Sequence, residues 1–124
     1  GVTLHRAFDL VPDLEDAINM AVDLGFERIL TSGRAPTSRE GVDDLQQRFE
    51  LADGRIKIMP GSGVNIDNAE MLLDRIPFAE IHSSCAVSRP IVSESARRLG
   101  FETASQKQTC PDLVRALKNY CLSR

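Results

Sequence analysis

The chain has 124 residues, of which 42% are hydrophobic and 27% charged, a composition typical of a folded globular protein. Its net charge of −3 and isoelectric point near 5.3 give no broad basic surface, so we expect no nucleic-acid partner. No apolar run approaches the length of a transmembrane helix, so we expect no membrane partner.

The cysteine content indicates a reducing compartment. Cys85, Cys110 and Cys121 are odd in number and include no Cys-x-x-Cys pair. Disulfide frameworks use even numbers of cysteines and belong to oxidising compartments. We therefore expect a cytoplasmic protein without structural disulfides.

Four short apolar runs recur every 24 to 27 residues, and each is followed at once by small or polar residues. They predict strands near residues 2–5, 28–31, 56–59 and 79–82, separated by helical segments. This alternation is typical of parallel (β/α) units, so the expected fold is α/β. Four such units make half of a TIM-type barrel of about 250 residues. We expect residues 1–124 to be a single partial barrel domain, either a fragment or one half of a longer chain.

Capping signals place the helices between these strands. Asp13 begins the first helix and Gly25 ends it. Thr37 and Glu40 have the spacing of a capping box and predict the start of the second helix. The third helix is expected over residues 67–74. The predicted buried stripe of the second helix, at helical spacing, consists of Val42, Leu45, Phe49 and Ala52.

The pattern changes after Cys85. Residues 86–109 are rich in Ser, Arg, Thr and Gln and lack sustained periodicity, so we expect an irregular connection, either functional or disordered. Pro111 and Asp112 then begin a C-terminal helix over residues 111–122.

Strand parity predicts a polar inner face. Side chains alternate between the two faces of a strand, and the aliphatic ones should pack under the helices. The predicted interior set is Thr3, His5, Arg28, Lys57, Met59, Glu80 and His82. Because an unpaired buried charge is costly, we expect Glu80 to pair with Lys57 or Arg28.

A glycine turn follows the third predicted strand. Gly61, Ser62 and Gly63 precede a helix, and backbone N–H groups at such a turn favour an anion. Ser83, at the end of the fourth predicted strand, completes the predicted anion-binding set. The alternative is a tight turn without a ligand.

Four polar residues at or beyond strand ends are the predicted catalytic or ligand-orienting groups: His5, Arg6, Asp9 and His82. Each histidine could act as a general acid or base, or could be structural. Arg6 could hold a carboxylate or phosphate. Asp9 could act as a base or could simply pair with Arg6.

The metal-binding potential of the chain is small. Cys85 and His82 could form a soft pair for copper or zinc, although a lone cysteine is more often a small buried apolar group. The residues alone leave any metal ligands unknown.

Four motifs in order and spacing resemble the CutC family, which is named for copper homeostasis. They are Val2-Thr3-Leu4-His5-Arg6-Ala7-Phe8-Asp9, Arg28-Ile29-Leu30-Thr31-Ser32-Gly33, Ile58-Met59-Pro60-Gly61-Ser62-Gly63-Val64 and Glu80-Ile81-His82-Ser83-Ser84. The resemblance implies the second half of a TIM-type barrel, copper as the bound ion, and a part in cytosolic copper homeostasis. Ser62 stands where the family usually has a third consecutive glycine, and the segment after Ser84 departs from the family.

Three functions therefore stay open. The first is a CutC-like protein that binds copper. The second is a barrel enzyme acting on a small phosphorylated or carboxylated substrate. The third is a non-catalytic half-barrel assembly module. The expected partners are a small anionic ligand or a copper ion, together with a second copy of the chain or a missing N-terminal half.

Overall fold

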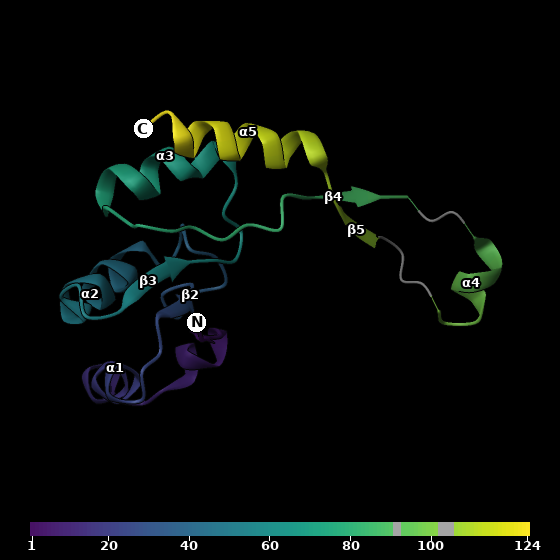
Figure 1. Ribbon diagram of the computed structural model, residues 1–124. Coiled ribbons are helices and arrows are strands. Elements are labelled where there is room, and N and C mark those ends of the chain that lie inside the picture. The colour runs from purple at the N-terminus through teal and green to yellow at the C-terminus, as the bar shows by residue number, and fades with distance from the viewer. Residues whose placement is uncertain (91–92, 102–105) are drawn as a thin grey trace. The chain divides into compact units, whose positions relative to one another are not determined.

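The computed structural model describes residues 1–90, 93–101 and 106–124. The chain forms two compact units, residues 1–83 and residues 84–124, a division that the sequence did not predict. Figure 1 traces their helices and strands along the chain.

The first unit is built on a parallel sheet. Its strands are β1 (Thr3–Leu4), β2 (Arg28–Thr31) and β3 (Lys57–Pro60), in the order β1-β2-β3. Arg28 of β2 lies opposite Thr3 on one side and Lys57 on the other. The fold is therefore α/β with successive parallel (β/α) units, as the spacing of the apolar runs predicts.

The core lies on one face of this sheet. Ile29 and Ile58 point to that face and are buried together with side chains from the helices α1 (Leu14–Asp23) and α2 (Val42–Ala52). Ile76 and Phe78, at and beyond the end of α3 (Ile66–Arg75), join the same cluster. Asp13 caps α1 by accepting a hydrogen bond from the Asp16 N–H at 2.9 Å, as expected.

The start of α2 differs from the predicted one. Thr37 Oγ1 does accept a hydrogen bond from the Glu40 N–H, at 3.3 Å, but this closes a turn, and the helix begins only at Val42. Gly41, the N-cap, lies directly against the end of β2, where a Cβ atom would fall 2.0 Å from the Ser32 carbonyl oxygen. The close backbone approach, rather than a side-chain cap, positions the helix.

The fourth predicted strand, residues 79–82, is absent from the described strands. The segment runs beside β3 and makes one backbone hydrogen bond to it, from His82 N–H to the Pro60 oxygen at 2.9 Å. One such bond is too few to form a ladder. The segment still places Glu80 beside the sheet, where the parity argument expects it.

A ladder of charged side chains crosses the inner face of the sheet. Glu80 accepts hydrogen bonds from Arg28 Nε at 2.6 Å and from Lys57 Nζ at 2.7 Å. Arg28 also donates to Thr3 Oγ1 at 3.2 Å. The hydrogen bonds from Lys57 and then Arg28 lower the pKa of the Glu80 carboxyl. Both predicted partners of Glu80 are thus engaged at once.

The second unit contains structure where the sequence predicts an irregular connection. Within residues 86–109, β4 (Ala86–Arg89) pairs antiparallel with β5 (Gln106–Thr109), and α4 (Glu94–Arg98) lies between them in sequence. Figure 1 shows α4 at the far end of this hairpin from α5 (Pro111–Leu122). Every β5 side chain is exposed, so no hydrophobic alternation marks the strand. Residues 91–92 and 102–105, part of the same prediction, lie outside the described residues.

The core of the first unit predicts a strong effect of truncating Leu45, which is fully buried on α2. Leu45→Ala should lower the free energy of unfolding by about 2–5 kcal/mol, because it leaves a cavity. Met20→Ala, at a side chain that is 62% exposed, should change it by less than about 0.5 kcal/mol. Urea titrations of both variants measure the difference, and equal effects would contradict this core assignment.

Candidate functional site

The loops that follow the strands of the first unit meet at one edge of the sheet. A short 3-10 helix, η1 (Arg6–Leu10), follows β1 and carries two of the predicted site residues. His5 caps η1 by accepting a hydrogen bond from the Ala7 N–H at Nδ1, 3.0 Å away. This bond uses one ring nitrogen of His5 for structure.

Asp9 joins the first loop to the second. Its Oδ1 accepts from Thr31 Oγ1 at 2.5 Å and from the Arg34 N–H at 3.4 Å. Its Oδ2 accepts from the backbone N–H and hydroxyl of Ser32, at 3.1 and 3.2 Å, and from Arg6 Nε at 3.3 Å. Only 9% of the side chain is exposed. Five donors therefore surround one nearly buried carboxylate.

A buried arginine adds a sixth contact to Asp9. The side chain of Arg48, on α2, is fully buried, with its Nη1 3.5 Å from Asp9 Oδ1 and its Nε 2.7 Å from Asp44. Its guanidinium carbon lies 5.3 Å from the centre of the Phe8 ring. Neither Nη atom has a hydrogen-bond acceptor among the described residues. The guanidinium is therefore held by one hydrogen bond from Nε to Asp44, by the charge of Asp9 and by the aromatic face of Phe8.

These contacts decide the protonation state of Asp9. Burial opposes ionisation, but the hydrogen bonds from Thr31 and Ser32 and the charge of Arg48 outweigh it and lower the pKa of the carboxyl. A carboxylate with lowered pKa and occupied lone pairs is a poor proton acceptor. Of the two roles predicted for Asp9, these contacts favour the partner of Arg6 over the general base.

Arg6 is the group that this network presents to solvent. Besides Asp9, it donates from Nη2 to Ser32 Oγ at 2.6 Å and to the Ala35 oxygen at 3.4 Å. The side chain remains 41% exposed. Among the described residues, nothing accepts a hydrogen bond from Nη1. Two of the three guanidinium nitrogens of Arg6 are thus held by contacts within the protein.

Two hydrogen bonds join the glycine turn after β3 to the loop that follows β2. Ser62 has a φ of +77° and Gly63 one of +71°, and the Ser62 hydroxyl donates to the Pro36 oxygen at 2.7 Å. Ser38 donates its hydroxyl to the Gly61 oxygen at 2.6 Å. Within the described part of the chain, no acceptor bonds the N–H groups of Ser62, Gly63 or Val64. The turn therefore has backbone N–H groups without an acceptor, whereas the Ser62 hydroxyl already donates to the Pro36 oxygen.

The remaining predicted residues are placed at the same edge but are not joined into one cluster. A Cβ atom on Gly61 would lie 3.5 Å from His82 Cδ2, so the His82 ring lies beside the glycine turn. The Ser83 hydroxyl donates to the Val64 oxygen at 2.5 Å. The side-chain hydrogen bond described for His5 stays within its own turn. Arg6 and Asp9 are brought together, and no side-chain hydrogen bond among the described residues joins either histidine to them.

The described residues do not bring three or more metal-ligating side chains together. Within residues 1–90, 93–101 and 106–124, no three His, Cys, Asp or Glu side chains are grouped as metal ligands. The oxygens of Asp9 and Glu80 are engaged by arginine or lysine. The three cysteines are thiols, and all of them belong to the second unit.

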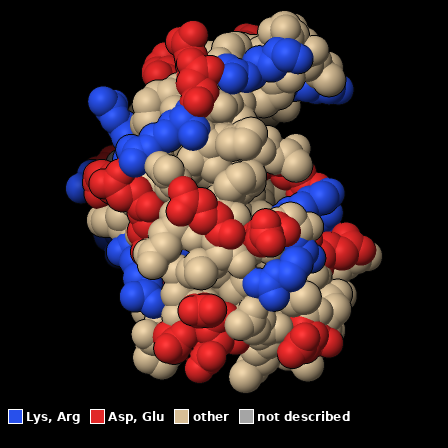
Figure 2. Space-filling model, turned by 90° about the vertical axis from the view of Figure 1, so that its left-hand side faces the viewer, with Lys and Arg blue, Asp and Glu red and all other residues tan. Residues whose placement is uncertain are grey.

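The surface charges match the composition. On the face that Figure 2 shows, basic and acidic side chains are interspersed rather than gathered by sign.

Sequence reasoning missed Arg48 and Ser38. Arg48 lies on the stripe that Leu45 and Ala52 define, and a charge at that position signals a buried ion pair. Ser38 carried no comparable signal, because its role depends on the approach of the Gly61 turn, which is distant in sequence.

The parallel units and the loops that meet at the carboxyl ends of their strands define this chain as half of a TIM-type α/β barrel. The model of the CutC family matches residues 1–87, and the chain belongs to that family. A CutC family protein of Rhizobium meliloti (strain 1021) is 49% identical over 118 residues, which cover 95% of this chain and 48% of that protein. One from Agrobacterium fabrum is 50% identical over 94% of this chain and 47% of its own length.

A solved structure supports the same fold. The chain from Streptococcus agalactiae, described provisionally as a copper homeostasis protein CutC, aligns with a TM-score of 0.61 and 32% identity, over 64% of this chain and 40% of that chain. The chain spans about half the length of the curated relatives it matches. Among the described residues, no helix is long and apolar enough to cross a membrane.

The lowered pKa of Asp9 predicts an acid-dependent stability. A depressed pKa in the folded state contributes stability above the ordinary carboxyl pKa of about 3.9, and this contribution is lost as the pH falls through the folded-state value. Asp9→Asn should therefore lower the free energy of unfolding by about 1–3 kcal/mol near neutral pH, and by less in acid.

The matched control is Asp43→Asn, which removes an exposed pair with Arg75 and should change the free energy of unfolding by less than about 1 kcal/mol. Denaturant titrations at neutral and acidic pH measure both. An Asp9→Asn effect that does not shrink in acid would contradict the assignment.

Proposed function

We propose that the carboxyl edge of the first unit binds the anionic group of a small phosphorylated or carboxylated molecule, with Arg6 as its anchor. The observation that carries the proposal is the state of the Arg6 guanidinium. Asp9 and Ser32 hold two of its nitrogens, and Nη1 faces no acceptor within the described residues. A pre-positioned guanidinium binds carboxylate or phosphate with little loss of side-chain entropy.

The glycine turn supplies the second contact of this proposal. Consecutive N–H groups in a turn with positive φ form an anion-binding concavity. Arg6 donates to Ala35 and Ser62 donates to Pro36, so both approach adjacent residues of one loop. His82, which lies beside Gly61, is the proposed acid or base at this edge. His5 and Ser83 have structural roles in this proposal.

A second candidate function is copper homeostasis. It is favoured by membership of the CutC family and by the description of the Streptococcus agalactiae relative. Because the described side chains of the first unit do not form a ligand group, copper would depend on the thiols of Cys85, Cys110 and Cys121. The same thiols support the cytoplasm as the proposed compartment.

The chain is also proposed to associate, either with a second copy or with a separate N-terminal half of the barrel. The outer edge of β1 and the charged inner face are the surfaces that a closed barrel would cover.

The anchor role of Arg6 predicts a specific loss of anion binding. Titration of the chain with inorganic phosphate should shift the backbone amide resonances of residues 61–64. Arg6→Gln should weaken this binding about tenfold or more, because a charge-assisted hydrogen bond is lost. Arg39→Gln, an equal change of charge at an exposed residue of the second loop, should not. The absence of shifts in the wild-type chain, or equal weakening by both variants, would overturn the proposal.

The copper function predicts that binding depends on cysteine. Equilibrium titration with Cu(I) should show binding by the chain, and the triple variant Cys85→Ser, Cys110→Ser and Cys121→Ser should lose it. Asp43→Asn serves as the control that leaves the thiols intact. No binding by the wild-type chain, or unchanged binding by the triple variant, would contradict this candidate.

A further inference from the structure

Arg48 is a fully buried cation, and the anion site proposed above does not use it. Its guanidinium donates one hydrogen bond, from Nε to Asp44 Oδ2 at 2.7 Å. Neither Nη atom has an acceptor among the described residues. Burial removes the water around a guanidinium, and each N–H group that then finds no acceptor costs free energy. The hydrogen bonds of Arg48 therefore do not account for its burial.

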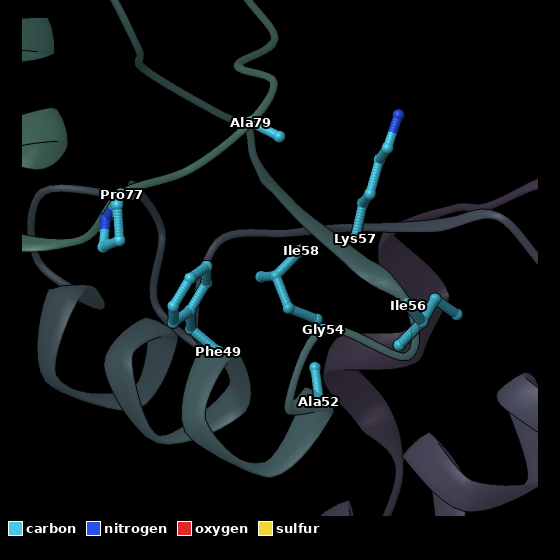
Figure 3. A pocket seen from close by; sticks show the side chains of 8 residues that line it. All are labelled: Phe49, Ala52, Gly54, Ile56, Lys57, Ile58, Pro77 and Ala79. Carbon is cyan, nitrogen blue, oxygen red and sulfur yellow. The ribbon is translucent and has the colours of Figure 1, made fainter.

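The packing of α2 does not require a cation at this position. Ala52, one turn after Arg48, is buried on the same stripe of the helix. Figure 3 shows the C-terminal end of α2, where Phe49 and Ala52 line an apolar groove with Ile58, and the Lys57 side chain points away from them. Replacing buried ionic groups by apolar side chains of similar volume is often neutral or stabilising. The charge of Arg48 therefore points to a role beyond packing.

Asp9 lies between Arg48 and Arg6. The Nη1 atom of Arg48 lies 3.5 Å from Asp9 Oδ1, on the buried side of the carboxylate. Arg6, which is 41% exposed, donates from Nε to Asp9 Oδ2 at 3.3 Å. The two cations thus contact different oxygens of a carboxylate that is only 9% exposed, and charges interact most strongly where water is excluded. The negative charge of Asp9 is therefore shared by two guanidinium groups.

The other charged groups near Asp9 do not take the place of Arg48. Arg34 contacts Asp9 through its backbone N–H, 3.4 Å from Oδ1, and its guanidinium donates to the Val11 oxygen at 2.7 Å. Asp44 holds Arg48 at Nε and is itself 28% exposed, so solvent and salt screen its charge. Arg48 is therefore the buried cation that offsets the charge of Asp9.

We propose that Arg48 is a positioning residue for the anion site, which it serves by sharing the charge of Asp9, so that Arg6 keeps its positive charge for the ligand. This inference rests on the anion-binding function proposed above. Without Arg48, the carboxylate of Asp9 forms an ion pair with Arg6 alone, and the anchor is neutralised. Loss of Arg48 therefore lowers the affinity for the anion even in a chain that is fully folded.

Titration of the whole chain with inorganic phosphate at one neutral pH, followed by the amide resonances of residues 61–64, measures the role of Arg48. Arg48→Met should weaken phosphate binding about tenfold, because Asp9 then neutralises Arg6. Arg48→Lys keeps a cation beside Asp9 and should stay within about threefold of the wild-type affinity. Arg48→Gln is the second neutral variant, for use if Arg48→Met does not fold.

Phe49→Leu is the matched control on the same helix. It loses the edge contact with the Phe78 ring, whose centre is 5.8 Å away, and should lower the free energy of unfolding without changing the phosphate affinity. The Nε–Hε resonance of Arg6 reports its hydrogen bond to Asp9. This resonance should shift in Arg48→Met, return toward its wild-type position in Arg48→Lys and stay unchanged in Phe49→Leu. Circular dichroism confirms that each variant is folded.

The possible outcomes separate this inference from the proposed function. A wild-type chain that does not bind phosphate would overturn both. Binding that Arg6→Gln weakens, but that is unchanged in the neutral variants of Arg48, would overturn the role of Arg48 alone. Equal losses of affinity in Arg48→Met and Phe49→Leu, or no recovery in Arg48→Lys, would assign Arg48 to the core instead.

Discussion

The carboxylate of Asp9 is the interaction on which the geometry of the functional edge depends. It lies between the first loop, the end of β2 and the buried Arg48, and it accepts hydrogen bonds from Thr31, Ser32 and Arg6. Removing one partner from such a network leaves buried donors unsatisfied, which costs more than the mean value of one hydrogen bond. The position of the exposed Arg6 guanidinium therefore depends on the position of the Asp9 carboxylate.

Electrostatics also organise the inner face of the sheet. Arg28, Lys57 and Glu80 come from three successive (β/α) repeats of the first unit, yet their side chains form one continuous row of ion pairs. Two carboxylates balance the two cations, because Arg28 also pairs with Glu27 at 3.4 Å.

Local patterns predicted the parts of the fold that depend on local chemistry. The alternation of apolar runs located β1, β2 and β3, and Asp13 located the start of α1, because strand parity and capping act within a few residues. The pairing of Glu80 followed from strand parity alone.

The predictions failed where contacts between residues distant in sequence decide the structure. The start of α2 depends on the Gly41 approach, residues 79–82 lack a full ladder, and the hairpin of β4 and β5 has no hydrophobic alternation to reveal it. At the site, the union of Arg6 and Asp9 was predictable from their spacing, whereas Arg48 and Ser38 act through residues far along the chain.

The contact between Gly33 and Gly41 limits how this loop can diverge among relatives. A Cβ atom on Gly33 would fall 2.2 Å from the Gly41 oxygen, and one on Gly41 would fall 2.0 Å from the Ser32 oxygen. Main chain therefore meets main chain, and no side chain can be inserted at either position without moving α2 from the sheet. Arg48 belongs to α2, so a displacement of α2 would also move the Arg48 guanidinium away from Asp9. A relative with a larger residue at either glycine must reroute the whole loop, and we expect the two positions to change together or not at all.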